Sequence, residues 1–297
     1  MNSVRPLTSA LISDPMSSFL DSIKIAAVDT ETSGVNPFRH ELIEIGAVNF
    51  NLNEIEDRFE VLIKPEKKHD PKARKVHKIS NEELESRGVG LSEAISRFLD
   101  FIGDRLLVFH NASFDLTFLK LSADKVKLEL PKNTYYDNLF LSKKYYPERE
   151  SHSLSSIREL LNLDTSVEHR ALADAEATAL SFMQILKEKG QGIDSRKSLQ
   201  KFMRYNRKMH KFMITLPKNY DEIEKYFQRR IRGHEYIKVN YRDNKGQDFT
   251  HMVQPLEMMV FNQQLYIKVK VQMTAEEKLI PLKFATFFDP ELGPTKF

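Results

Sequence analysis

Two carboxylates lie two positions apart at the end of the first apolar run of the α/β region. Asp29 and Glu31 directly follow Ile25–Val28. Side chains alternate between the faces of a strand, so this pair points the same way from the strand end. Ligands of open α/β sheets bind at this edge. The pair predicts a ligand site, although Asp-x-Glu alone equally describes a polar strand end that enters a loop.

Two further acids follow later strand and helix patterns. Asp115 comes after the apolar run Leu106–Phe109, in the first turn of an expected helix, where the helix dipole favours an anion. Asp174 lies in an expected helix, Leu172–Lys187, five residues after His169. That spacing puts the two far apart around a helix, so His169 has to leave from the preceding loop if both serve one site. Taken singly, Asp115 also fits an ordinary acid at a helix start, and His169 also fits a surface histidine.

Four acids in one cleft would repel one another, and this is tolerable when cations neutralise them. The chain contains no Cys, and oxygen ligands favour hard ions such as Mg²⁺ or Mn²⁺. Two such ions about 4 Å apart can clamp the attacking and leaving oxygens of a phosphodiester displacement. His169 would take the proton from the attacking water, because an unperturbed histidine titrates near neutrality.

The elements that would position these residues form an α/β pattern. Strands are expected at Ile25–Val28, Leu42–Phe50, Phe59–Ile63, Leu106–Phe109 and Thr134–Tyr136. Helices are expected after Ser80, over Leu91–Ile102, Phe114–Ser122, Asn138–Lys144, Leu154–Leu161 and Leu172–Lys187. Ser80 with Glu83 predicts a capping box, and Asp137 is interpreted as an N-cap. Strands in a meander, then alternating with helices, indicate a mixed sheet flanked by helices.

Residues 23–190 resemble the DEDDh (DnaQ-like) exonucleases. The matching blocks are Val28-Asp-Thr-Glu-Thr-Ser-Gly34, Leu42-Ile-Glu-Ile-Gly-Ala-Val48, His110-Asn-Ala-Ser-Phe-Asp115 and His169-Arg-Ala-Leu-Ala-Asp174. Each block is weak alone, but four in the right order and spacing are specific. The resemblance implies a ribonuclease-H-like fold and a 3′→5′ exonuclease that releases mononucleotides from DNA or RNA 3′ ends, taken as single strands.

The resemblance also implies residue roles. Four carboxylates are expected to bind two Mg²⁺ or Mn²⁺ ions, namely Asp29, Glu31, Asp115 and Asp174. His169 is expected to act as the catalytic base. Thr32 and Asn111 correspond to family positions near the terminal nucleotide.

A basic segment follows the α/β region. Ser195–Lys211 is rich in Lys and Arg and contains no acid, and its apolar residues trace a stripe. This predicts a basic amphipathic helix. Arg204, Arg207 and Lys208 are expected to contact the phosphate backbone of a nucleic acid. The open alternative is a solvated face of a packed helix.

Closely spaced strand patterns beyond residue 217 favour a small β-barrel or sandwich. This part resembles WYL domains, which are small Sm-like barrels, in Ile237–Gly246, Val253–Leu256 and Leu265–Ile267. It departs from them because Leu-Tyr-Ile replaces the name-giving Trp-Tyr-Leu. The expected domains are an N-terminal extension at 1–22, the exonuclease domain at 23–190, a basic helical linker at 191–216 and the smaller barrel at 217–297.

Composition narrows the function classes. The 297 residues carry a formal net charge of +3, which permits a nucleic-acid partner without requiring one. The absence of Cys excludes disulfides and thiolate chemistry. No apolar run approaches the roughly 20 residues of a membrane helix, and no signal peptide is evident, so a cytoplasmic location without membrane contact is expected.

The sequence is compatible with several functions. The first is an exonuclease whose C-terminal domain assists nucleic-acid binding or regulation. The second is a non-catalytic metal- and nucleic-acid-binding regulatory protein, which the intact His169 disfavours because structural metal binding has no use for a base. A polymerase proofreading subunit is a further reading, disfavoured because such subunits usually carry a short tail. Preference between DNA and RNA, and a homo-oligomer or protein partner through the C-terminal domain, stay open.

Overall fold

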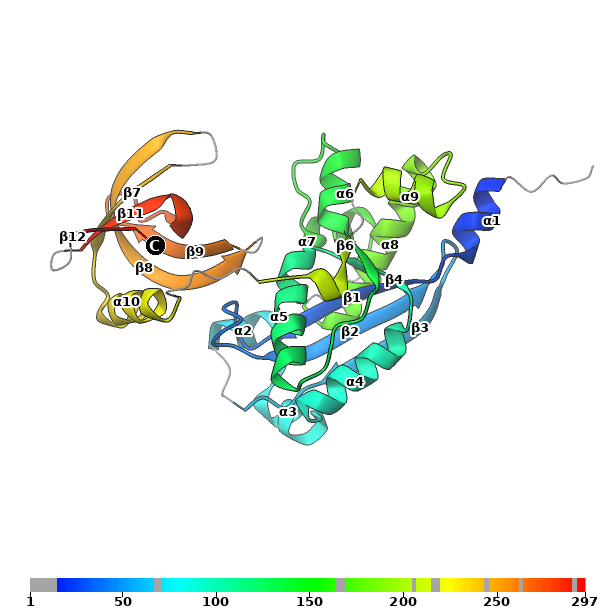
Figure 1. Ribbon diagram of the computed structural model, residues 1–297, viewed down its shortest axis with the longest axis horizontal. Helices are drawn as coiled ribbons and strands as arrows, with labels where there is room; N and C mark the ends of the chain where they lie inside the picture. The colour runs from blue at the N-terminus through cyan, green and yellow to red at the C-terminus, as the bar shows by residue number, and fades with distance from the viewer. Residues whose placement is uncertain are drawn as a thin grey trace, which may run out of the picture.

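The computed structural model describes residues 15–66, 71–163, 169–204, 207–214, 220–242, 246–261, 264–289 and 293–296. Two six-stranded sheets lie side by side, and the last strand of the first sheet, at residues 207–208, precedes the C-terminal part of the chain (Figure 1). The pairing of the first strand with the second shifts register after Glu31, and the pairing of the second with the third shifts after Asn49. Within the described residues, no helix is long and apolar enough to cross a membrane.

The first sheet is mixed and runs in the order β3-β2-β1-β4-β5-β6. Its strands are β1 (Ile25–Thr32), β2 (Leu42–Phe50), β3 (Ile55–Leu62), β4 (Leu106–Phe109), β5 (Thr134–Asp137) and β6 (Arg207–Lys208). The first three strands form an antiparallel meander, and β1, β4 and β5 run parallel. The predicted mixed sheet is confirmed.

Helices cover both faces of this sheet, and they are α1 (Pro15–Ser22), α2 (Pro71–His77), α3 (Asn81–Arg87), α4 (Leu91–Ile102), α5 (Ala112–Lys125), α6 (Asn138–Tyr145), α7 (Leu154–Leu160), α8 (Ala171–Lys189) and α9 (Arg196–Met203). On β1, Ala26 and Val28 enter the core shared with α4 and α5, whereas Ile25 and Ala27 enter the core shared with α8. By alternation, Asp29 continues on the α8 side.

The cap at Asp137 and the first half of the predicted Ser80–Glu83 capping box are confirmed, whereas the Glu83 carboxylate accepts from Arg87. The Ser80 hydroxyl accepts a hydrogen bond from the backbone N–H of Glu83 at 3.0 Å and begins α3. Asp137 accepts from the N–H of Leu139 and begins α6. These caps depend on neighbours in the chain, so spacing alone could reveal them.

The predicted single helix over Ser195–Lys211 is wrong. Helix α9 ends at Met203, because Arg204 adopts a left-handed backbone conformation with φ of 65°. Arg207 and Lys208 form β6, which pairs antiparallel with β5, and a 3₁₀ turn η1 (Met209–Lys211) follows. The backbone of this segment satisfies its hydrogen bonds at an open sheet edge instead of within a helix.

The C-terminal sheet is antiparallel, in the order β10-β9-β8-β7-β11-β12. Its elements are α10 (Tyr220–Gly233), β7 (Ile237–Arg242), β8 (Asp248–Phe261), β9 (Gln264–Val271), β10 (Glu277–Pro281), the 3₁₀ turn η2 (Leu282–Phe284), β11 (Ala285–Asp289) and β12 (Gly293–Lys296). The strand-rich expectation is confirmed, whereas α10 was not predicted. The WYL resemblance, the Sm-like closure and the domain boundaries stay predictions.

The loop after β1 touches α10. The Phe38 and Tyr220 rings are 4.7 Å apart between centroids, and Arg39 Nε lies 3.5 Å from Glu224 Oε1. This loop begins directly after Thr32, at the end of the strand that carries the paired carboxylates.

Candidate active site

Four buried or nearly buried carboxylates converge where β1 ends. Asp29 and Glu31 lie in the last half of β1, Asp115 in the first turn of α5 and Asp174 in the first turn of α8. Burial raises the pKa of Asp29 well above its usual range, and the charges of Asp115, Asp174 and Glu31 add to this effect. The structure therefore brings together the four acids that the sequence singled out.

The same cause acts on the other members of this acid cluster. Burial raises the pKa of Asp115 to about 7, although a hydrogen bond from the Thr30 hydroxyl, 2.8 Å from Asp115 Oδ1, opposes the rise. The pKa of Glu31 is raised well above its usual range by burial and then by Asp174. These buried carboxylates repel one another, so added positive charge would stabilise their ionised forms.

His169 joins the acid cluster from the loop before α8, as expected. It has a left-handed backbone with φ of 63°, and its backbone N–H donates to Asp174 Oδ2 at 3.1 Å. One ligand atom each of Glu31, His169 and Asp174 lies within 4.8 Å of the other two. Oxygen donors with one imidazole, short of positive charge, fit a hard divalent cation.

Gly46 of β2 lets the start of α8 approach the sheet. It pairs with Asp29 across the β1–β2 register. A Cβ on Gly46 would lie 2.1 Å from the backbone of both Ala171 and Leu172, a distance that real Cβ atoms do not reach. A side chain here would push α8 away, and Asp174 with it.

Glu44, also on β2, fixes the turn between His169 and α8. Its side chain is fully buried; Oε1 accepts from Arg170 Nη2 at 2.8 Å and Oε2 from the Ala171 N–H at 2.9 Å. Arg170 reaches Glu60 as well, at 3.3 Å. The sequence interpretation missed Glu44 as a site residue, although a charged residue inside the apolar run Leu42–Phe50 was a signal.

Asp137 holds two helix starts. Besides capping α6, its Oδ1 and Oδ2 accept from the backbone N–H groups of Asn111 and Ala112, each at 3.2 Å. Asn111 is left-handed, with φ of 73°, and precedes α5. The N-cap prediction is confirmed but incomplete, because Asp137 also anchors the turn that leads to Asp115.

The five predicted substrate-binding residues do not all lie at this edge, because β6, which carries Arg207 and Lys208, pairs with the start of β5 and not with its end. The Thr32 hydroxyl donates to the Gly34 carbonyl at 2.9 Å, and Asn111 lies in the turn between β4 and α5. Arg204 and Arg207 are exposed, whereas the Lys208 ammonium donates to the Thr134 hydroxyl at 2.6 Å. Their contact with substrate stays a prediction.

Arg158 is a site residue that was not predicted from the sequence. It lies on α7 and is the largest side chain among the fully buried residues that the structure describes. Its Nε and Nη2 donate to Asp174 Oδ1 at 3.0 and 2.7 Å. Nothing in the local spacing of Leu154–Leu160 sets it apart from an exposed helix arginine.

This fold and this group of acids define an exonuclease domain of the DEDDh type. The model of the Exonuclease family matches residues 26–182, more than half of the chain. The chain therefore belongs to the DEDDh (DnaQ-like) exonuclease family.

Curated relatives include bacterial polymerases. The DNA polymerase III PolC-type protein of Thermotoga maritima is 37% identical over 193 residues, which are 64% of this chain and 14% of that protein. The DNA polymerase III PolC-type protein of Bacillus cereus is 32% identical over 162 residues, 54% and 11% of the respective chains. The chain thus spans a small part of these relatives' length.

Two solved structures share the fold. The nuclease domain of 3′hExo, a DEDDh family member bound to rAMP, has a TM-score of 0.51 at 20% identity and covers 60% of this chain and 96% of its own. E. coli exonuclease I, in complex with a dT13 oligonucleotide, has a TM-score of 0.53 at 14% identity, covering 84% and 55%. The second likeness extends beyond the length of the family match.

Proposed function

We propose that the chain is a metal-dependent 3′→5′ exonuclease that releases mononucleotides from DNA or RNA ends. The observation that carries this proposal is the convergence of the four acids with His169 at one end of β1. Asp29, Glu31, Asp115 and Asp174 would hold two Mg²⁺ or Mn²⁺ ions. When bound, such ions would stabilise charge on the attacking and leaving oxygens of the phosphodiester.

His169 has the position of a general base. Its loop leaves the ring beside Glu31 and Asp174, and the bond from its own N–H to Asp174 ties the backbone to the acid cluster. A neutral imidazole can accept a proton from the attacking water on a ring nitrogen near physiological pH. Because Arg170 follows directly and is bound to Glu44, the turn that presents the imidazole is anchored on both sides.

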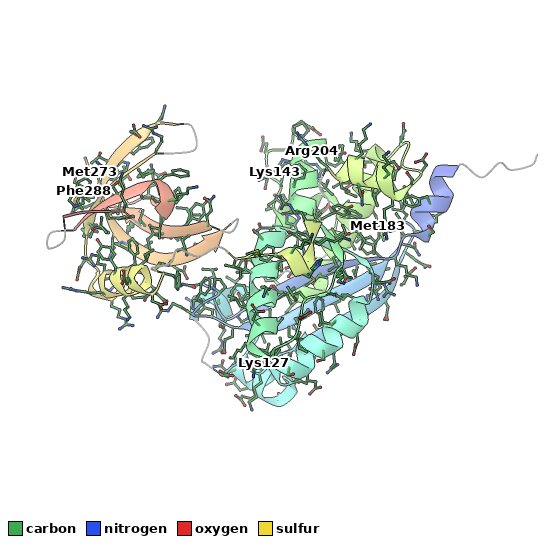
Figure 2. All side chains as sticks on the ribbon, in the orientation of Figure 1. Lys127, Lys143, Met183, Arg204, Met273 and Phe288 are labelled. Carbon is green, nitrogen blue, oxygen red and sulfur yellow. The ribbon has the colours of Figure 1, made fainter. Side chains whose placement is uncertain are left out.

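Basic residues support the nucleic-acid part of the proposal. Helices α6 and α9 are neighbours, because the Tyr145 and Phe202 rings stack 4.5 Å apart and Lys144 Nζ donates to the Phe202 carbonyl. Lys143 and Arg204 extend from this end of the exonuclease domain (Figure 2). Such cations would contact the phosphate backbone of a strand whose 3′ end enters the acid cluster. The C-terminal domain would assist nucleic-acid binding or regulate it. We place this activity in the cytoplasm.

The test is digestion of 5′-labelled and 3′-labelled DNA and RNA oligomers with Mg²⁺. A 3′→5′ exonuclease gives a descending ladder from the 5′ label and a labelled mononucleotide at once from the 3′ label. Asp29→Ala and His169→Ala should both abolish this pattern, whereas Arg97→Ala, on the exposed face of α4, should leave it unchanged. Long internal fragments would instead indicate an endonuclease.

A second candidate is editing in partnership with a polymerase. The sequence identity to PolC-type polymerases favours this role, because the chain matches a part of proteins that are polymerases. An editing enzyme should remove a mismatched primer terminus at least severalfold faster than a paired one when a polymerase competes for the same end. Equal rates on both primers would leave only the general exonuclease.

A further inference from the structure

The candidate site contains an arginine for which the proposed mechanism has no use. Arg158 donates two hydrogen bonds to one oxygen of Asp174, whose other oxygen accepts from the His169 N–H. Arg158 and Asp174 are both buried. A buried guanidinium is costly unless a carboxylate compensates it, so separating the two partners inside the protein would leave an uncompensated buried charge.

This geometry bears on cation binding. Asp174 belongs to the Glu31–His169–Asp174 group whose ligand atoms converge. Both of its oxygens have protein donors, so a cation on Asp174 has to share an oxygen with a donor. It also meets the fixed positive charge of Arg158, which is as close to Asp174 as any hydrogen-bond partner.

We propose that Arg158 is an internal counter-charge that holds Asp174 in position before cations bind and weakens the affinity of the site for them. Arg158 is therefore a positioning residue that sets the concentration range over which divalent ions load the site. The inference rests on the proposed function for the identity of the metal ligands, but it concerns loading and not catalysis.

The direct test is Mn²⁺ binding to the full chain, measured by isothermal titration calorimetry. Arg158→Met removes the charge while keeping much of the apolar stem, and we expect about tenfold tighter Mn²⁺ binding, or about 1.4 kcal/mol. Arg158→Lys keeps the charge and should bind Mn²⁺ within about twofold of the unmodified chain. Arg97→Met, which removes the same charge from an exposed ion pair, should leave the affinity unchanged.

Thermal unfolding provides the second readout. In EDTA, Arg158→Met should melt below the unmodified protein, because Asp174 loses its compensating charge, and added Mn²⁺ should raise its melting temperature by the larger increment. If Arg158→Met does not fold in EDTA, Arg158→Gln replaces it, with the same expected direction. Equal or weaker Mn²⁺ binding by the folded neutral variants overturns the proposal.

A cycle with Asp174→Asn separates this inference from the proposed function. If Arg158 acts through Asp174, then Arg158→Met should no longer tighten Mn²⁺ binding in the Asp174→Asn background. An affinity change that persists there contradicts the proposed route. Because no nucleic acid is present in these measurements, a failed digestion assay would sink the exonuclease proposal while leaving the binding result intact.

Discussion

Glu31 of β1 and Glu44 of β2 stand directly opposite each other in the antiparallel register. Like charges so placed repel, and burial raises the pKa of both carboxyls. The two carboxylates have different partners. Glu44 binds the guanidinium and backbone of the turn before α8, whereas Glu31 faces His169 and Asp174. One acid of the pair thus anchors the candidate base, and the other is available to a cation.

Replacing Glu44 tests this division. Glu44→Gln removes the charge that holds Arg170, so the His169 turn should loosen. We expect kcat to fall about 10- to 100-fold, the range typical of residues that orient metal-site ligands, with little change in KM. Glu60→Gln is the matched control, because Glu60 pairs with the same arginine from a partly exposed position. A Glu60 variant as impaired as the Glu44 variant would contradict a specific role for Glu44.

Gly46→Ala should separate α8 from the sheet. The added methyl would overlap the backbone of Ala171 and Leu172, which cannot move without shifting Asp174. We expect a loss of roughly 2–3 kcal/mol in the free energy of unfolding and weaker Mn²⁺ binding. Gly90→Ala is the control, since its Cβ would meet nothing within 4 Å. Urea unfolding of both variants gives the comparison, and equal stabilities would refute the packing argument.

The acid cluster predicts an unusual pH dependence in EDTA. The folded pKa of Asp115 is about 7, and those of Asp29 and Glu31 are raised, whereas the unfolded chain ionises these acids by about pH 5. The folded state therefore binds more protons, and its stability is lost as pH rises through the folded pKa values. The melting temperature should fall from pH 6.5 to 8.

Magnesium and one variant serve as controls for that slope. Saturating Mg²⁺ should remove the fall, and Asp115→Asn should flatten it. His110 acts weakly in the opposite direction, because burial lowers its folded pKa to about 4 and only the unfolded chain still releases its proton just above pH 6.5. A melting temperature in EDTA that rises between pH 6.5 and 8 would contradict the prediction.

Asp137→Ala should cost more than the loss of an ordinary helix cap. It removes the acceptor for the start of α6 and for the turn that leads into α5 and Asp115. We expect roughly 2–3 kcal/mol of lost stability together with reduced exonuclease activity. Ser153→Ala, which removes the single cap of α7, should cost about 1 kcal/mol and leave activity intact. Chemical denaturation and oligomer digestion check both expectations.

The basic segment shows where periodicity misleads. The stripe over Ser195–Lys211 is real in its first half, where Leu199 and Met203 are buried on α9. Further along, Met209 and Phe212 are also buried, but Met209 begins the 3₁₀ turn η1 and Phe212 directly follows it, beside the start of β5. Helix and strand patterns cannot be told apart in so short a run when an open sheet edge competes for the backbone.

The sequence by itself determined strands β1 to β5, helices α3 to α8 and the caps at Ser80 and Asp137, because these depend on spacing along one chain. Together with the family resemblance, the same spacing selected the five residues of the candidate site. Only the tertiary structure decided that Glu44 would anchor the His169 turn, that Gly46 would admit α8 and that Arg158 would pair with Asp174. Each of these depends on which distant segments come into contact. Burial at such a contact makes an uncompensated charge or an added side chain costly.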